Sequence, residues 1–316
     1  MKKLLSLFLL AAFVLSGSVM GRAQTPALEG RVSISGAWAL YPMVVKWAEE
    51  FQKLYPQVKI DVQAGGAGKG IADVIAEMVD FGMVSRDVQP VEKEKGAMPF
   101  AVTKDAVVPM INTKNPYLSE ILQKGLTQKA LIDIWINKAA ATWADVLGGE
   151  APAPIHIFTR SDACGAAETW ALFLGKRQED LTGVAVYGDP GLADAVRRDP
   201  LGIGFNNVNF AYDPKTLTPI SGMVAAPIDL DGNGKIDPVE QFYGTRDELT
   251  KAIAENRYPS PPARDLYIVS KGVPTKPAAV AFLRWILSEG QKYVLETGYI
   301  RLSAEKLKAG LEQINK

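Results

Sequence analysis

Two short stretches of the chain carry residues whose types and spacing could do chemistry. The first, from Ile155 to Trp170, reads Ile-His-Ile-Phe-Thr-Arg-Ser-Asp-Ala-Cys-Gly-Ala-Ala-Glu-Thr-Trp. Alternating apolar residues predict a strand ending at Arg160, and Ser161 or Asp162 could cap a helix that stops at Gly175. Unpaired N–H groups at a helix start, with a forked arginine beside them, favour an anion. An ordinary strand-to-helix connection with a surface arginine remains the plain alternative.

The second stretch, 229–240, reads Asp-Leu-Asp-Gly-Asn-Gly-Lys-Ile-Asp-Pro-Val-Glu and matches the calcium loop of an EF-hand. Oxygen ligands stand at its first, third, fifth, ninth and twelfth places, and the seventh offers a backbone carbonyl. The flanking residues do not suggest long EF helices, so we expect one structural Ca²⁺ rather than a paired sensor. A polar acidic turn without metal is the alternative. The expected ligands are Asp229, Asp231, Asn233, Lys235, Asp237 and Glu240.

The start of the chain predicts export. Lys2 and Lys3 precede an apolar run, and small residues follow as far as Ala23, which is typical of a signal peptide over 1–23. The remaining 293 of the 316 residues are enough for two domains with their own cores. Loss of three basic residues from a chain with 35 basic and 35 acidic ones leaves a slightly acidic protein, which argues against nucleic acid as a partner. We expect a periplasmic or secreted protein.

Strands and helices alternate along the mature chain, which predicts an α/β fold. A strand around Val32 runs into Gly36, a helix starts near Tyr41, and a second strand leads into the glycine-rich loop Ala64–Gly70. That loop has neither the dinucleotide fingerprint nor the Walker Gly-Lys-Ser/Thr, so nucleotide binding is disfavoured. Three strand ends would instead offer backbone N–H groups. These strand ends are Gly36–Ala39, Gly66–Gly68 and Arg160–Ala166.

Taken in order, the motifs resemble the periplasmic phosphate-binding proteins that feed ATP-driven uptake systems, over nearly the whole mature chain. The segments that carry the resemblance are Ser35–Pro42, Gln63–Gly70, Phe81–Asp87, Thr142–Gly149, Arg160–Ala166 and Asp265–Val269. The resemblance implies a two-lobed clamshell (class II-like) that binds without catalysis, each lobe being a mostly parallel sheet flanked by helices. Lobe 1 would comprise 24–112 and 264–316, and lobe 2 would comprise 113–263. The implied partners are phosphate or another oxyanion and an inner-membrane ABC permease, and the chain would be a monomer.

The resemblance also implies a ligand set, and here the chain departs from the family. The implied ligand-binding residues are Ala37, Trp38, Ala39, Gly66, Ala67, Gly68, Ser85, Arg86, Arg160, Asp162, Cys164, Gly165 and Ala166. The family's serine and threonine hydroxyls are replaced at several of these positions by alanine, tryptophan and cysteine. Losing four or five hydroxyl donors at about 1 kcal/mol each would weaken phosphate binding. Arg86 would stand where some members carry aspartate, which adds a cation and removes a proton acceptor. A larger or less hydrated oxyanion, or a carboxylate, fits this smaller donor set and Trp38 equally well.

Two other functions stay open from the sequence. A sensory protein, whose closed form is read by a membrane signalling partner, would use the same two lobes. A thiol-dependent enzyme or metalloid binder would use Cys164, because a thiol at a helix start beside Arg160 could have a lowered pKa. His156 would be the base of such an enzyme, but no third group is placed to orient it. Cys164 replacing a serine of similar size is the simpler interpretation, so we expect no enzyme.

Overall fold

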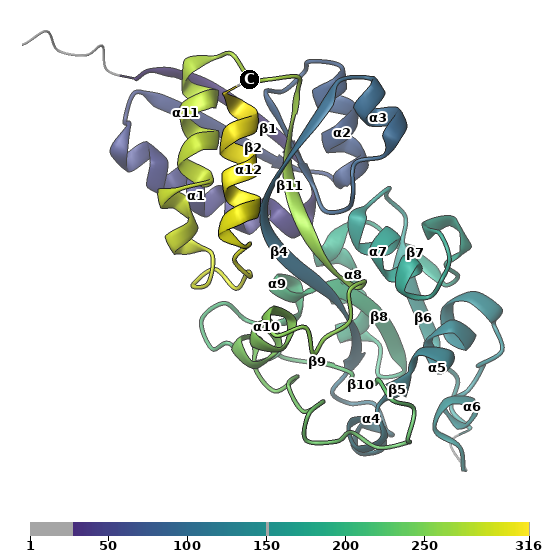
Figure 1. Cartoon of the computed structure of the whole chain (residues 1–316). Helices are drawn as coiled ribbons and strands as arrows, with labels where there is room; N and C mark the ends of the chain where they lie inside the picture. The colour runs from purple at the N-terminus through teal and green to yellow at the C-terminus, as the bar shows by residue number, and fades with distance from the viewer. Residues whose placement is uncertain (1–27, 150–151, 316) are drawn as a thin grey trace, which may run out of the picture.

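The computed structural model describes residues 28–149 and 152–315, so the expected signal peptide at 1–23 lies outside the described residues. The chain forms two α/β lobes joined by two long strands, β4 (Ala97–Asn112) and β11 (Ala263–Lys271), which run side by side through the middle of the molecule (Figure 1). No helix among the described residues has the length and apolar character needed to cross a membrane.

Lobe 1 is built on three parallel strands, with β1 (Gly30–Gly36) between β2 (Val58–Ala64) and β3 (Phe81–Val84). Helix α1 (Tyr41–Leu54) has a proline in its first turn and buries one apolar face against this sheet. The other helices of the lobe are α2 (Ala67–Ile75), α3 (Pro90–Glu94), α11 (Pro277–Ile286) and α12 (Ala304–Ile314). Parallel strands end at one edge of a sheet, so the loops after β1, β2 and β3 lie together.

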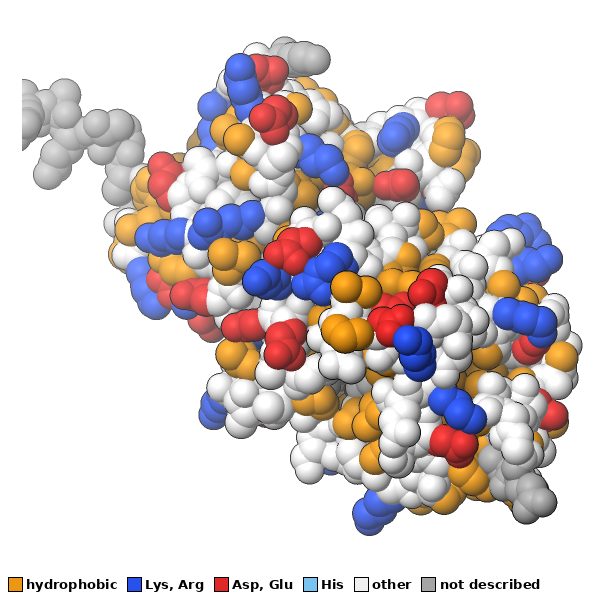
Figure 2. Space-filling view, turned by 60° about the horizontal axis from the view of Figure 1, so that its bottom comes forward, with side chains coloured by type: hydrophobic (Ala, Val, Ile, Leu, Met, Phe, Trp, Pro, Cys, Tyr) orange, Lys and Arg blue, Asp and Glu red, His pale blue; other side chains and the backbone are white. Residues whose placement is uncertain are grey.

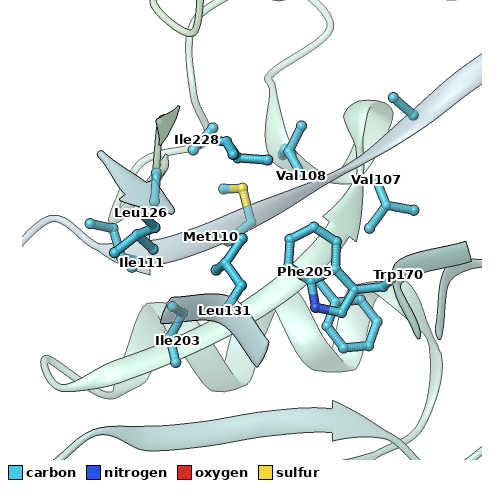
Figure 3. Close-up of a cluster of buried hydrophobic side chains, with 14 of the residues drawn as sticks. Val107, Val108, Met110, Ile111, Leu126, Leu131, Trp170, Ile203, Phe205 and Ile228 are labelled. Atoms are coloured by element: carbon cyan, nitrogen blue, oxygen red, sulfur yellow. The ribbon is translucent and has the colours of Figure 1, made fainter. Parts of the chain in front are cut away.

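Lobe 2 repeats this plan. Its strands β8 (Gly202–Asn207), β6 (His156–Arg160) and β7 (Val184–Val186) are parallel, while β9 (Met223–Ala225) pairs with β4 and β10 (Ile228–Asp229) pairs with β5 (Leu126–Thr127). Its helices are α4 (Leu118–Lys124), α5 (Gln128–Ile132), α6 (Trp143–Leu147), α7 (Gly165–Phe173), α8 (Gly188–Arg198), α9 (Val208–Ala211) and α10 (Arg246–Ala254). Trp170 stacks on Phe205 with ring centroids 5.7 Å apart, beside Val107 and Val108 of β4 (Figure 3). This core therefore ties α7 to β4 and β8.

The hinge lies where β4 passes from one lobe to the other. Residues 97–106 of β4 pair with β11, and residues 107–111 pair with β8. The apolar core of lobe 1 includes Val102 and Leu266, whereas that of lobe 2 begins at Ala106 and includes Ala263. The two cores therefore meet on these strands, at 103–105 of β4 and 264–265 of β11, and β4 continues unbroken from one core into the other.

The expected two-lobed α/β architecture is confirmed, with two corrections of detail. The sheet is mixed rather than mostly parallel at its centre, because β4 and β11 run antiparallel to each other and to their neighbours β8 and β3. Helix α2 also begins at Ala67, within the glycine-rich loop predicted over Ala64–Gly70.

Candidate functional site: the interlobe cleft

The predicted anion loops of both lobes meet at one place. In lobe 1 they follow β1, β2 and β3, and in lobe 2 they follow β6. The Gly68 N–H donates to the carbonyl of Ala163 over 3.1 Å, which joins the two lobes directly. A Cβ added to Gly165 would lie 2.2 Å from the carbonyl oxygen of Ser85, so only glycine permits this approach. The structure therefore shows the clamshell closed, with backbone against backbone.

Several backbone N–H groups at this meeting point have no acceptor among the described residues. They belong to Trp38, Ala39, Ala67, Gly165 and Ala166, at the starts of three helical segments. At the edge of the contact between the lobes, a cavity of about 780 Å³ is lined by Gly68, Ala163 and Cys164, among others, but by none of these five residues. Free amides at helix starts are the groups that bind anions. The expected backbone donors are thus brought together, and Gly68 is the one already used between the lobes.

Arg160 is buried and carries two carboxylate partners. Its Nε and Nη2 donate to Asp162 over 2.8 and 2.6 Å, and its Nη1 lies 2.9 Å from Asp189 Oδ1. The latter contact is an ion pair rather than an aligned hydrogen bond. Burial alone would lower the pKa of Arg160, but the negative groups around it, Asp189 foremost, raise it. Asp189 was missed from the sequence, where it only marked the opening of α8.

Because Asp162 is held by Arg160, it does not cap α7 as the sequence suggested. Cys164 is the N-cap instead, and its Sγ accepts a hydrogen bond from the Ala167 N–H over 3.4 Å. The thiol is 5% exposed. Burial raises the pKa of Cys164 to about 12, so the lowered pKa required for a reactive thiol is not found. His156 is paired with Asp199 at 2.7 Å.

Arg86 lines the same cavity as Gly68 and Cys164, but its charge is already paired. Its guanidinium binds Glu92 of lobe 1, with its Nη2 2.7 Å from Oε1, and its Nε lies 2.9 Å from Glu168 of lobe 2. Gln89 donates to Glu168 over 3.1 Å. The hydrogen bond with Glu92 is the main reason that the pKa of Arg86 is raised. We call Arg86, Gln89, Glu92 and Glu168 the outer latch, because they hold the two lobes together beside the cleft.

Trp38 also spans the cleft. Its indole lies against Gly188 of lobe 2, where an added Cβ would be 3.4 Å from the ring. Tyr187 packs edge-on against the same indole, with the two ring centroids 6.5 Å apart. Its Nε1 is buried and has no acceptor among the described residues. Trp38 therefore brings one unused N–H donor to a position where the resembling family carries a hydroxyl.

The comparisons with known proteins agree with this geometry. A family model described as a PBP superfamily domain matches residues 21–290. The chain belongs to the PBP superfamily. Two similar proteins are both named phosphate-binding protein PstS. The protein from Methanocaldococcus jannaschii is 24% identical, and the match covers 99% of this chain and 96% of that protein. The protein from Pseudomonas aeruginosa PAO1 is 26% identical, and the match covers 91% of this chain and 88% of that protein.

Solved structures show the same fold. A putative phosphate ABC transporter substrate-binding protein from Clostridium perfringens, with bound phosphate, superposes with a TM-score of 0.70 at 24% identity, covering 87% of this chain and all of that one. The effector-binding domain of QuiR in complex with shikimate has a TM-score of 0.53 at 13% identity, covering 84% and 99%. The resemblance drawn from the sequence motifs is thereby confirmed for the family, and the PBP fold also serves proteins with other ligands.

This PBP-superfamily chain has its acidic loop in lobe 2, at the end of β10. Carboxylate oxygens of Asp229, Asp231 and Glu240 lie within 4.8 Å of one another. Asp229 and Glu240 are buried, and no lysine or arginine among the described residues forms an ion pair with these three. Gly234 adopts φ +83°, the left-handed conformation that the sharp turn needs. Buried carboxylates without a cation are costly, so the donor set fits a bound Ca²⁺.

The other expected calcium ligands are turned toward each other. Asn233 Nδ2 donates to Asp231 and Asp237, and Lys235 Nζ lies 2.9 Å from Asp237 Oδ1. Rotation of the Asn233 amide would present its oxygen instead of its nitrogen. Three of the expected ligands thus converge, and Asn233 and Asp237 stand next to them.

Proposed function

We propose that the chain is the extracytoplasmic solute-binding component of an ABC uptake system and captures phosphate or a related oxyanion between its lobes. The observation that carries this function is the convergence of free helix-start amides from both lobes around Arg160. Relatives that are named phosphate-binding proteins align with this chain over nearly their whole length. The apolar segment at the start of the sequence supports export, and a membrane permease would receive the ligand from the closed form.

The ligand would be held mainly by neutral donors. Arg160 is balanced by Asp162 and Asp189, so it is not an unpaired cation for the ligand. On the face shown in Figure 2, basic and acidic side chains are interspersed, without a broad field of one sign. Binding then depends on amide N–H groups, the Ser85 hydroxyl and Trp38 Nε1, all of which are correctly placed only when the lobes are closed. Ligand binding therefore favours the closed form.

Calorimetric titration of the mature, ligand-stripped protein with phosphate tests this function, with sulfate and acetate as parallel titrants. We expect micromolar or tighter binding of phosphate. Arg160→Met should abolish the heat while leaving cooperative melting. Absence of heat with every oxyanion, in a folded wild-type protein, would overturn the proposed ligand class, and tighter binding of acetate than of phosphate would redirect it to carboxylates.

We also propose that the loop 229–240 holds one structural Ca²⁺. The carboxylates of Asp229, Asp231 and Glu240 would be its first ligands, and the ion would supply the positive charge that the buried Asp229 and Glu240 lack. Titration of the chelator-treated protein with Ca²⁺ should show one site and a rise of the melting temperature. A protein whose melting is unchanged by Ca²⁺ at millimolar concentration would show that the loop is only an acidic turn.

A further inference from the structure

A chain of buried polar side chains runs from the hinge to Arg160. It begins at Asp105 of β4, which lies opposite Arg264 in the β4–β11 ladder. The Arg264 Nη2 donates to Asn207 Oδ1 at the end of β8. Asn207 Nδ2 donates to Asp189 Oδ1 over 2.7 Å, and the same oxygen lies 2.9 Å from Arg160 Nη1. We call these five residues the relay.

The relay crosses the two strands, β4 and β11, that join the lobes. Asp105 and Arg264 sit between the two apolar cores, on the strands that form the hinge. Asn207, Asp189 and Arg160 all belong to lobe 2. The hydrogen bond between Arg264 and Asn207 is therefore the link that a change of hinge angle must strain or break.

Stability alone is a poor explanation for these charges. Every member of the relay is at most 9% exposed. Among the described residues, both Asp105 carboxylate oxygens and the Nε and Nη1 of Arg264 lack an aligned hydrogen-bond partner. Burial raises the pKa of Asp105 to about 7, although Arg264 opposes this shift. Buried charges that are incompletely paired weaken a fold, which leaves a positional role as the better reason for them.

We propose that Arg264 and Asn207 are positioning residues that couple hinge closure to the orientation of Arg160 in the ligand cleft. This inference rests on the proposed function, in which the helix-start amides around Arg160 hold the anion. In the closed form Arg264 fixes the Asn207 oxygen, so the Asn207 amide points its N–H toward Asp189. Asp189 and Asp162 then hold the Arg160 guanidinium from two sides. When the hinge opens, Asn207 is released and Arg160 loses its defined orientation.

The test is Asn207→Asp followed by a reciprocal exchange. Asn207→Asp keeps the shape and the acceptor for Arg264, but it places a carboxylate against Asp189. The double variant Asn207→Asp/Asp189→Asn has the same total charge as wild type and reverses the hydrogen bond between these residues. Residue 189 then donates its amide N–H to residue 207, and a rotation of its side chain turns its amide oxygen toward Arg160. We expect the single variant to weaken phosphate binding at least tenfold, and the exchange to return it within threefold of wild type. Asn115→Asp, at another buried asparagine of lobe 2, should leave the affinity unchanged.

Small-angle scattering of the ligand-free proteins gives a readout that needs no ligand. The single variant should have a larger radius of gyration than wild type, and the exchange should reverse this. If wild type gives no phosphate heat, the proposed ligand fails and scattering alone decides the relay. A single variant that matches wild type in scattering, or an exchange that restores melting but neither affinity nor compactness, would overturn the relay.

Discussion

The interlobe cleft and the acidic loop are both built to surround a small ion, but they assemble their donors in opposite ways. The loop takes all its oxygen groups from twelve consecutive residues, 229–240. The cleft takes its N–H groups from loops after β1, β2 and β6, which belong to two lobes. A site made from consecutive residues depends on local turns. A site made from separate loops exists only while the lobes are closed, so its affinity includes the free energy of closure.

The largest expected effect comes from blocking closure. In Gly165→Ala the new Cβ would meet the Ser85 carbonyl at 2.2 Å, a clash with backbone that only opening of the lobes relieves. We expect phosphate affinity to fall by about 100-fold or more while the melting temperature in Ca²⁺ stays near that of wild type, measured by calorimetry and thermal melts. Gly310→Ala, whose Cβ would come within 3.2 Å of a flexible leucine, is the control. Wild-type affinity in Gly165→Ala would show that the ligand does not need this closed form.

The opposite change removes the expected calcium site in the loop 229–240 and leaves the interlobe cleft intact. Glu240→Gln replaces a buried carboxylate at the twelfth place of the loop, so the stabilisation by Ca²⁺ should be lost. At a Ca²⁺ concentration 100 times the Kd this stabilisation is about 2.7 kcal/mol, visible as a rise of several degrees in the wild-type melt. Phosphate affinity should stay within twofold. Glu312→Gln, an exposed change in lobe 1, serves as control. If Glu240→Gln were still stabilised by Ca²⁺, the ion would not bind in this loop.

A smaller effect is expected from the outer latch. Glu168→Gln removes the ion pair that joins Arg86 to lobe 2 while Arg86 keeps Glu92. Such a half-buried pair contributes roughly 1 kcal/mol, so phosphate affinity should fall about three- to tenfold and become less sensitive to salt. Glu120→Gln breaks an exposed pair within lobe 2 and should change nothing. Equal affinities for Glu168→Gln and wild type at low salt would show that the latch does not stabilise the closed form.

The smallest effect is expected at Cys164. Its thiol is buried and its pKa is raised to about 12 by burial, so it stays neutral and acts as a helix cap. Serine caps helices at least as well, so Cys164→Ser should bind phosphate within threefold of wild type. The native wild-type protein should react with a thiol reagent only after unfolding. Loss of binding in Cys164→Ser together with rapid thiol reaction would revive a thiol-dependent function.

Much of the fold could be predicted because its signals are local. The apolar periodicity and the proline of α1 place its helix over Tyr41–Leu54, and alternating residues place β2 and β6. The cap of α7 was misassigned because Asp162 and Cys164 are both capable of the role. Only the competition from Arg160, which takes Asp162, decides between them.

The loops that form the cleft could be predicted, but the distant residues that pair with their charged side chains could not. Arg160 could be singled out by its position after a strand and before a helix start. Asp189, Asn207 and Arg264 carry no comparable local pattern, and they join the site only because β8, α8 and β11 converge at the hinge. The pairing of Arg86 could not be predicted either, because its partner Glu168 lies on α7, a helix of the other lobe.

The sequence by itself determined the alternating α/β elements, the helix-start amides and the spacing of the acidic loop, because each depends on residues a few positions apart. The tertiary structure alone decided which charges are already paired and which donors stay free. Ion pairs and steric fit join residues that are distant in the chain. Thus Arg160 is balanced by Asp189, Arg86 is drawn into the outer latch, and Gly165 allows the lobes to touch.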